Sequence, residues 1–215
     1  KTNPKVIYVS CSGYGQWGPL RFFPSWDLIA QSMSGVAQLT GFGEDQTYKL
    51  PDYYGDFLPG IFGAMATVGA LNQREKTGKG QFIDVSQVEV LFRMMHHWSY
   101  MDLTGEELKS TGNVDPTMVP SGIFRTQDEQ FVSIAIATDE QFISLLKAMD
   151  KMDLSGDSRF YKAFERLKPE NADEICRIVD DWIKQKQLSD IIVLAQELGF
   201  PAAKVMDDIQ IANDE

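Results

Sequence analysis

The sequence has 215 residues, of which 43% are hydrophobic, and this suffices for one large domain or two modest ones with a substantial core. Its formal net charge of −11 argues against nucleic acid as a partner, because nucleic-acid binding requires a basic stripe. No apolar stretch approaches the ~20 residues of a membrane span and no secretion leader opens the sequence, so we expect a soluble chain in the cytoplasm without a membrane partner.

Strand and helix signals alternate in the first half of the chain. Val6–Val9 is a short β-rich run that leads into the glycine-rich loop Ser10–Pro19. Apolar residues then take a helical spacing over Trp26–Met33. A long connection with glycine and proline delivers the chain to Asp56, after which a helix is predicted from Ile61 to about residue 74.

A second strand and another helix complete this half. Gln81–Val85 is predicted to be a strand after a tight turn at Thr77–Gly80. Ser86 and Glu89 fit a capping box, which predicts a long helix over residues 88–103. Strand, helix and strand in this order are typical of an α/β layer.

The second half has the pattern of a small α+β unit. Gly122–Thr126 and Gln130–Ile136 predict a β-hairpin, and Thr138–Gln141 predicts a capped helix. Helical spacing returns over Ile175–Ile183 and again over Ser189–Leu198.

Charge also separates the two halves. Residues 1–112 hold nine Lys or Arg against eleven Asp or Glu, whereas residues 113–215 hold eleven against twenty. We therefore predict a domain boundary near Gly112, with residues 1–112 as part of a large α/β domain and residues 113–215 as a small α+β domain. The nearly neutral first part is the better host for an anionic ligand.

Asp56 is the leading candidate for chemistry. A carboxylate held where a helix begins stays ionised and exposed, as a nucleophile requires. Gly55 and Gly60 let the backbone approach a ligand, and Pro59 presets φ near the helix entrance. The plainer interpretation is an N-cap that accepts orphan backbone N–H bonds. The glycine-rich surroundings favour a crowded binding site.

Other motifs indicate less. His96 and His97 are adjacent on a predicted helix, so they point about 100° apart and cannot chelate one metal together. Gly13–Gly18 has the spacing of a dinucleotide-binding loop, but prolines interrupt the helix that should follow it. Cys11 and Cys176 have no ligand-like spacing, so neither a metal site nor a disulfide is expected.

The loop aromatics are open to two interpretations. They could stack a ligand, although clustered aromatic side chains more often form a core. They are Trp17, Phe22, Phe23 and Trp26.

Taken together, six blocks resemble the class III CoA-transferases, the formyl-CoA and carnitine CoA-transferase family. They are Asn3–Tyr8, Ser12–Gln16, Asp27–Gly35, Gly55–Asp56, Thr77–Gln81 and Ile83–Ser86. Four further blocks resemble that family's small domain, so the resemblance covers essentially the whole chain. They are Gly112–Asn113, Pro120–Arg125, Asp157–Phe160 and Gly199–Ala202.

The resemblance implies a Rossmann-like large domain, part of which is present here, and a definite activity. The aspartate matching Asp56 attacks an acyl-CoA thioester, and an aspartyl-CoA thioester then passes CoA to a carboxylic acid. Gly13, Gly15 and Gln16 resemble the loop that closes over the acyl group, and Trp26 occupies an aromatic position near it. Acyl-CoA is a co-substrate, no cofactor is bound permanently, and the family forms interlocked homodimers.

Two alternatives accompany this interpretation. Racemases of the same superfold use a histidine where this sequence has Trp26, and indole has no basic nitrogen, so transfer is favoured over racemisation. The sequence also resembles an internal fragment without the family's preceding nucleotide-binding region, and a non-catalytic fragment is the other alternative.

Overall fold

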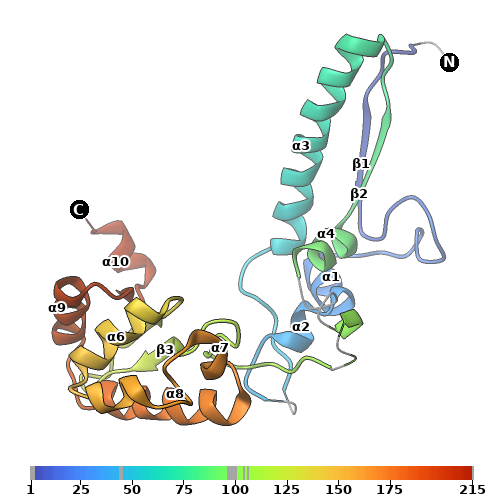
Figure 1. Ribbon diagram of the computed structural model, residues 1–215. Helices are drawn as coiled ribbons and strands as arrows, with labels where there is room; N and C mark the ends of the chain where they lie inside the picture. Colours follow the sequence, from blue (N-terminus) through green and yellow to red (C-terminus); the bar gives the residue numbers. More distant parts are fainter. Residues whose placement is uncertain (1–2, 44–45, 96–100, 104, 106, 215) are drawn as a thin grey trace. The chain divides into compact units, whose positions relative to one another are not determined.

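The computed structural model describes residues 3–43, 46–95, 101–103, 105 and 107–214 (Figure 1). The chain forms two compact units, Lys1–Gly112 and Asn113–Glu215. Among the described residues, none of the helices combines the length and apolar character that a membrane span needs.

Unit 1 is built on a strand–helix–strand arrangement. Strand β1 (Tyr8–Ser12) pairs in parallel with β2 (Phe82–Ser86), with Tyr8 opposite Phe82 and Ser12 opposite Ser86. Parallel strands require a crossover connection, and here it holds α1 (Asp27–Ser34), α2 (Val36–Leu39) and α3 (Tyr54–Thr77). The short helix α4 (Gln87–Met94) follows β2. This arrangement confirms the predicted α/β class.

Helix α3 lies along the two strands (Figure 1). The approach is close at Gly63, where an added Cβ would lie 3.3 Å from Cys11 Sγ. The helix begins at Tyr54, whereas the sequence predicted a start at Ile61. Pro59 lies inside the helix, where its fixed φ suits helical backbone but it has no N–H to donate to the carbonyl oxygen four residues earlier. Asp56 therefore lies within the first turn of the helix and not ahead of it.

The predicted helix after β2 is shorter than expected. Ser86 is its N-cap, as predicted, and the Ser86 side chain accepts a hydrogen bond from the backbone N–H of Glu89. Helix α4 ends at Met94, because the C-cap Met95 has extended backbone. Residues 96–100, which include both histidines, lie outside the described residues, and residues 101–103 are helical.

Unit 2 has the predicted hairpin within a three-stranded antiparallel sheet of order β3-β4-β5. Its strands are β3 (Ser121–Arg125), β4 (Phe131–Ala135) and β5 (Ala202–Lys204). Its helices are α6 (Asp139–Ala148), the 3-10 helix η1 (Met152–Gly156), α7 (Ala163–Arg166), α8 (Pro169–Ile183), α9 (Leu188–Leu198) and α10 (Asp208–Ala212). The Thr138–Gln141 capping box at the start of α6 is present.

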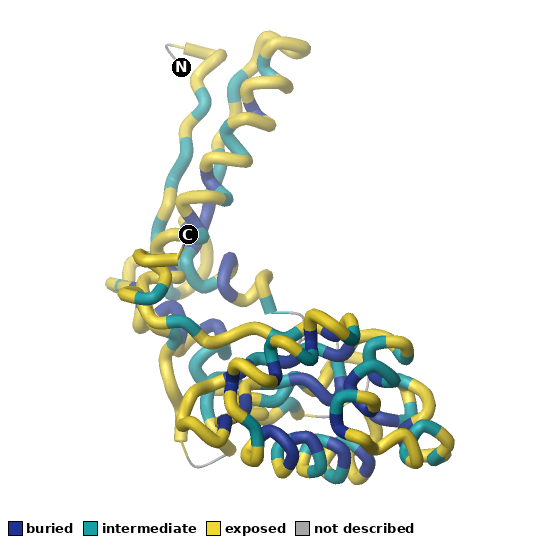
Figure 2. Tube along the Cα trace, turned by 90° about the vertical axis from the view of Figure 1, so that its left-hand side faces the viewer, coloured by how far each residue is buried: buried dark blue, intermediate teal, exposed yellow. Residues whose placement is uncertain are grey.

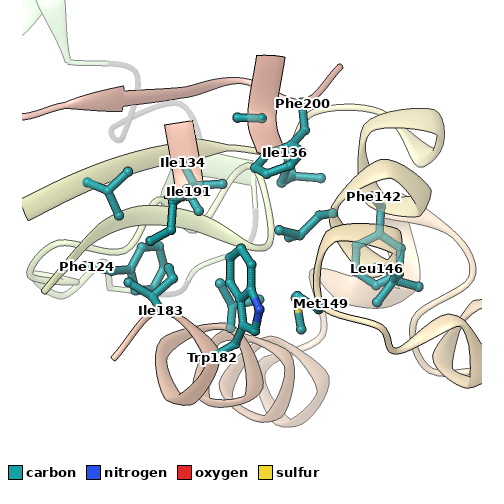
Figure 3. Close-up of a cluster of buried hydrophobic side chains, with 14 of the residues drawn as sticks. Phe124, Ile134, Ile136, Phe142, Leu146, Met149, Trp182, Ile183, Ile191 and Phe200 are labelled. Carbon is teal, nitrogen blue, oxygen red and sulfur yellow. The ribbon is translucent and has the colours of Figure 1, made fainter. Parts of the chain in front are cut away.

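The hydrophobic core of unit 2 joins the sheet to α6, α8 and α9 (Figure 3). Phe124 and Ile134 from the sheet, Phe142 from α6, Trp182 from α8 and Ile191 from α9 are all buried in it. Arg166 is the largest fully buried side chain of the described residues.

Many large apolar side chains of unit 1 are exposed, among them Phe57, Ile61 and Met65 of α3. In Figure 2 much of α3 and of the two strands has the colours of exposed and intermediate residues. Trp17, Phe22, Phe23 and Trp26 are all exposed, so the interpretation of these aromatics as core is wrong for this structure. They lie in or just after the glycine- and proline-rich loop that follows β1. The backbone of this loop is irregular, so the aromatic side chains do not pack against the face of a sheet or helix.

Candidate functional site

Asp56 is the third residue of α3, in the first turn, where the helix dipole favours a negative charge. Its side chain is exposed and borders two hollows of about 350 Å³ each. The first is lined by Cys11, Ser12, Gly13, Ser25, Trp26, Asp56, Pro59, Gly60 and Gln87. The second is lined by Trp26, Asp27, Leu28, Lys49, Asp52, Tyr53 and Asp56. Of the described residues, Asp56 and Trp26 alone border both hollows.

Gln87 orients the carboxylate of Asp56. Its side-chain Nε2 donates a hydrogen bond to Asp56 Oδ1. Gln87 is the first residue of α4, directly after the N-cap Ser86, so the end of β2 and the start of α4 fix its position. Gln87 was not among the predicted site residues, although its place directly after the predicted N-cap Ser86 was a usable signal.

Asp56 does not cap its own helix. The N-cap residue of α3 is Tyr53, and the backbone N–H of Gly55 donates to Asp27 Oδ1 at 2.7 Å. The N–H groups of Asp56 and Phe57 both donate to the Tyr53 carbonyl oxygen at 2.9 Å. The N–H groups of Gly55 and Asp56 are thus satisfied by other residues, and the Asp56 carboxylate is left available for a ligand or a reaction.

The glycine-rich loop after β1 divides into two parts. Gly13 lines the first hollow with Asp56, and its carbonyl oxygen accepts a hydrogen bond from Val88 N at 3.2 Å. Gly15 and Gln16 line neither hollow, because this part of the loop is tied to β2. There Gln16 N donates to Asp84 Oδ2 at 2.7 Å. The structure thus brings Gly13 and Trp26 to Asp56 but not Gly15 or Gln16.

Asp84 is a second residue that sequence reasoning missed. Its Oδ1 is buried and has no hydrogen-bond partner among the described residues. An added Cβ at Gly15, which has φ of 81°, would lie 3.2 Å from Asp84 Oδ2. Asp84 therefore anchors the loop. Its place in the Ile83–Ser86 block was the only signal for it in the sequence.

Metal chemistry has no preformed site in the part of the chain that the structure describes, where no three His, Cys, Asp or Glu side chains are grouped to hold an ion. The two cysteines are free thiols, Cys11 exposed and Cys176 partly buried. Burial and the nearby charge of Asp173 raise the pKa of Cys176 to about 11.

Comparison with protein-family models gives a match to CoA-transferase family III over residues 1–215. The chain belongs to this family. The match confirms the resemblance drawn from the ten sequence blocks, and it includes both units.

Two curated relatives illustrate what family III members do. One is the acetyl-CoA:oxalate CoA-transferase of Acetobacter aceti, 32% identical over 218 residues, with 99% of this chain and 54% of the relative covered. Another is the succinyl-CoA–D-citramalate CoA-transferase of Chloroflexus aurantiacus, 30% identical over 213 residues, with 99% and 52% covered. The chain thus spans about half the length of the curated relatives it matches.

Solved structures share the family III fold. A CAIB/BAIF family protein from Brucella suis superposes with a TM-score of 0.78 and 26% identity, covering 99% of this chain and 56% of that one. A hypothetical protein from Mycobacterium tuberculosis gives a TM-score of 0.82 at 23% identity with the same coverage, which supports the fold alone.

Proposed function

We propose that this protein acts as a CoA-transferase that moves CoA from an acyl-CoA thioester to a carboxylic acid, with Asp56 as the nucleophile. The observation that carries the proposal is the position of Asp56. In a chain of family III, an exposed carboxylate in the first turn of α3 borders two hollows and is oriented through one oxygen by Gln87.

The chemistry begins at the Asp56 carboxylate. One oxygen attacks the carbonyl carbon of the donor thioester, the C–S bond breaks, and CoA leaves as a thiolate. The product is a mixed anhydride between Asp56 and the donor acid. The thiolate then attacks Asp56 Cγ, and the donor acid leaves as a carboxylate, so an aspartyl-CoA thioester remains.

The acceptor reverses these steps. Its carboxylate attacks Asp56 Cγ and displaces CoA thiolate, which gives a mixed anhydride between Asp56 and the acceptor. The thiolate attacks the acceptor's carbonyl carbon, the new acyl-CoA forms, and the Asp56 carboxylate is restored. Two carboxylates exchange one thioester, so no external oxidant, reductant or metal is needed for the atoms to balance.

Three features of the site support this mechanism. Gln87 holds Oδ1, which fixes the carboxylate in one orientation, and orientation of reacting groups is a large part of enzymatic rate enhancement. Gly13 lines the same hollow without a side chain, so a thioester can approach closely. Trp26 borders both hollows with an exposed indole, a surface suited to an acyl or pantetheine chain.

Racemisation is the weaker alternative. It requires a second base opposite the aspartate, and at the place of the racemase histidine this chain has Trp26, whose indole N–H only donates. The curated relatives named above are transferases in their names, and they include no racemase.

We also infer that the working form is a homodimer in the cytoplasm. The exposed apolar side chains along α3 are the kind of surface that other protein covers, and the free thiols are compatible with a reducing compartment. Light scattering of the full-length protein tests the dimer, and a monomeric mass at micromolar concentration would refute it.

The decisive experiment is intact-mass and peptide-mass analysis of the full-length protein incubated with a panel of acyl-CoA donors. We expect a mass gain on the Asp56 peptide that hydroxylamine removes. Asp56→Asn abolishes both the adduct and thioester exchange. Glu75→Gln, which neutralises an exposed carboxylate near the other end of the same helix, leaves both intact. Exchange at the normal rate in Asp56→Asn would overturn the mechanism.

A further inference from the structure

A buried chain of polar groups joins α1 to the start of α3. Asp27 is only 6% exposed and Gln31, one turn later on α1, is fully buried. Gln31 Nε2 donates to Asp27 Oδ2 at 2.8 Å, and Gln31 Oε1 accepts a hydrogen bond from Leu50 N at 2.8 Å. Asp27 Oδ1 accepts from Gly55 N at 2.7 Å. Both ends of the segment Leu50–Gly55 are therefore tied to one face of α1.

This segment ends one residue before Asp56, and it is under constraint. Asp52 within it has φ of 60°, a left-handed conformation that is uncommon for residues with a side chain, although Asp adopts it more readily than most. A side chain at Gly55 would be crowded, because an added Cβ would lie 3.0 Å from Asp27 Oδ1 and 3.2 Å from Ala30 Cβ. The start of α3 is thus pressed against α1 at the residue next to Asp56.

Stability of α1 alone does not explain a buried carboxylate here. An ionised group at 6% exposure is costly to bury, and it is retained only where donors compensate it. Both oxygens of Asp27 do accept hydrogen bonds, and one of the two donors is the backbone of α3. Asp27 contributes the cap that the α3 N-terminus lacks from its own N-cap residue, Tyr53.

We propose that Asp27, acting with Gln31, is a positioning residue that sets the place of the Asp56 carboxylate relative to Gln87 and the bound thioester. Asp27 and Gln31 are called the α1 brace below. The inference rests on the proposed function, since it assigns a role in placing the Asp56 nucleophile. A shift of 1 Å in a reacting group costs about 10²-fold in rate, so a loosened brace lowers kcat although neither brace residue enters the reaction.

The direction of the hydrogen bonds allows a test by exchange of the two side chains. In Asp27→Asn the side-chain NH₂ introduced at position 27 faces the side-chain NH₂ of Gln31, so two donors meet. If the Gln31 amide turns over to accept this hydrogen bond, its NH₂ group instead faces the backbone N–H of Leu50, and two donors meet there. In Gln31→Glu two carboxylates face each other without a proton between them.

The double variant Asp27→Asn, Gln31→Glu reverses one hydrogen bond and keeps the other two. The amide introduced at position 27 donates to the carboxylate introduced at position 31, and that carboxylate also accepts from Leu50 N. The amide oxygen at position 27 accepts from Gly55 N. The double variant thus restores every hydrogen bond and the total charge.

The experiment measures kcat, KM and the hydroxylamine-sensitive Asp56 adduct in the full-length protein, at a temperature well below the unfolding midpoint of every variant. We expect each single variant to lose about 10²-fold in kcat with a smaller change in KM, and the double variant to return to within roughly tenfold of wild type. Hydrogen exchange of the peptide covering residues 50–56 should rise in the single variants and fall again in the double.

Ser34→Ala is the matched control. Ser34 is also buried on α1, but its hydroxyl donates only to the Gln31 carbonyl oxygen of the same helix. We expect it to keep wild-type kcat. Single variants that exchange faster over residues 50–56 but keep wild-type kcat would overturn the inference and leave the proposed function standing. A wild-type protein without transfer and without an Asp56 adduct would instead refute the proposed function.

Discussion

Arg166 offers the strongest quantitative prediction for unit 2. Its side chain is fully buried, and its guanidinium donates to three acceptors, which are the Val119 carbonyl oxygen at 2.9 Å, the Phe160 carbonyl oxygen at 2.7 Å and Asp139 Oδ1 at 3.2 Å. The guanidinium carbon also lies 4.2 Å from the centre of the Phe142 ring. One side chain therefore ties α7 to the start of α6 and to the segments before β3 and α7.

Arg166→Met keeps most of the volume and removes all three donors. Each of the two buried carbonyl oxygens left without its donor costs roughly 1–3 kcal/mol, whereas Asp139 is partly exposed and keeps its ion pair with Lys162. We expect unit 2 to lose about 2–6 kcal/mol of unfolding free energy. The unfolding free energy of Arg166→Lys should lie between those of the wild type and Arg166→Met, because a single ammonium group cannot reproduce the planar guanidinium that donates to three acceptors.

Hydrogen exchange of slow amides in α8 and β4 of the full-length protein measures this free energy for unit 2 alone. Arg177→Met is the control, since Arg177 lies on α8 with 67% of its side chain exposed and a 3.8 Å contact to Asp181. It should change the free energy by no more than about 0.5 kcal/mol. A loss below about 1 kcal/mol in Arg166→Met would refute the reasoning.

Three further predictions concern pH, thiol reactivity and backbone packing. Burial opposes the shift, but hydrogen bonding to Lys162 and the adjacent buried guanidinium hold the pKa of Asp139 below its ordinary 3.8. The stability that its charged form provides is therefore present at neutral pH and lost as pH falls below about 4, and acid unfolding curves should show a smaller loss in Asp139→Asn. With a pKa of about 11, Cys176 is a thiolate in only about 10⁻³ of molecules at pH 8, so iodoacetamide should label the exposed Cys11 and reach Cys176 only after unfolding, as peptide mass spectrometry would show. Gly55→Ala should destabilise the protein by about 1–3 kcal/mol through overpacking against α1, measured by thermal unfolding, and a wild-type midpoint would contradict the packing described.

The sequence predicted those elements whose signals are local. The Thr138–Gln141 capping box, the N-cap Ser86 and the hairpin of β3 and β4 depend on residues within a few positions of one another, and all are present. The start of α3 was predicted at Ile61, after Pro59 and Gly60, whereas the structure has both residues inside the helix.

The site was harder to predict because its contacts are distant in sequence. Asp27 lies 28 positions from Gly55, and Gln87 lies 31 positions from Asp56, so no local pattern shows that they meet. Asp56 itself could be predicted from the glycines beside it and from the family resemblance. The exposure of Trp26 depends on tertiary packing, which composition alone does not fix.

Asp27 of α1 caps the start of α3, so the residue that supports this helix end is not the residue that is proposed to react. Because Gly55 N is held by Asp27 and not by Asp56, exchanging the Asp56 carboxylate for an amide leaves the helix end supported. Asp56→Asn should therefore fold normally but be inactive. Crystals of this variant soaked with a donor acyl-CoA should show the intact thioester bound before any bond is broken.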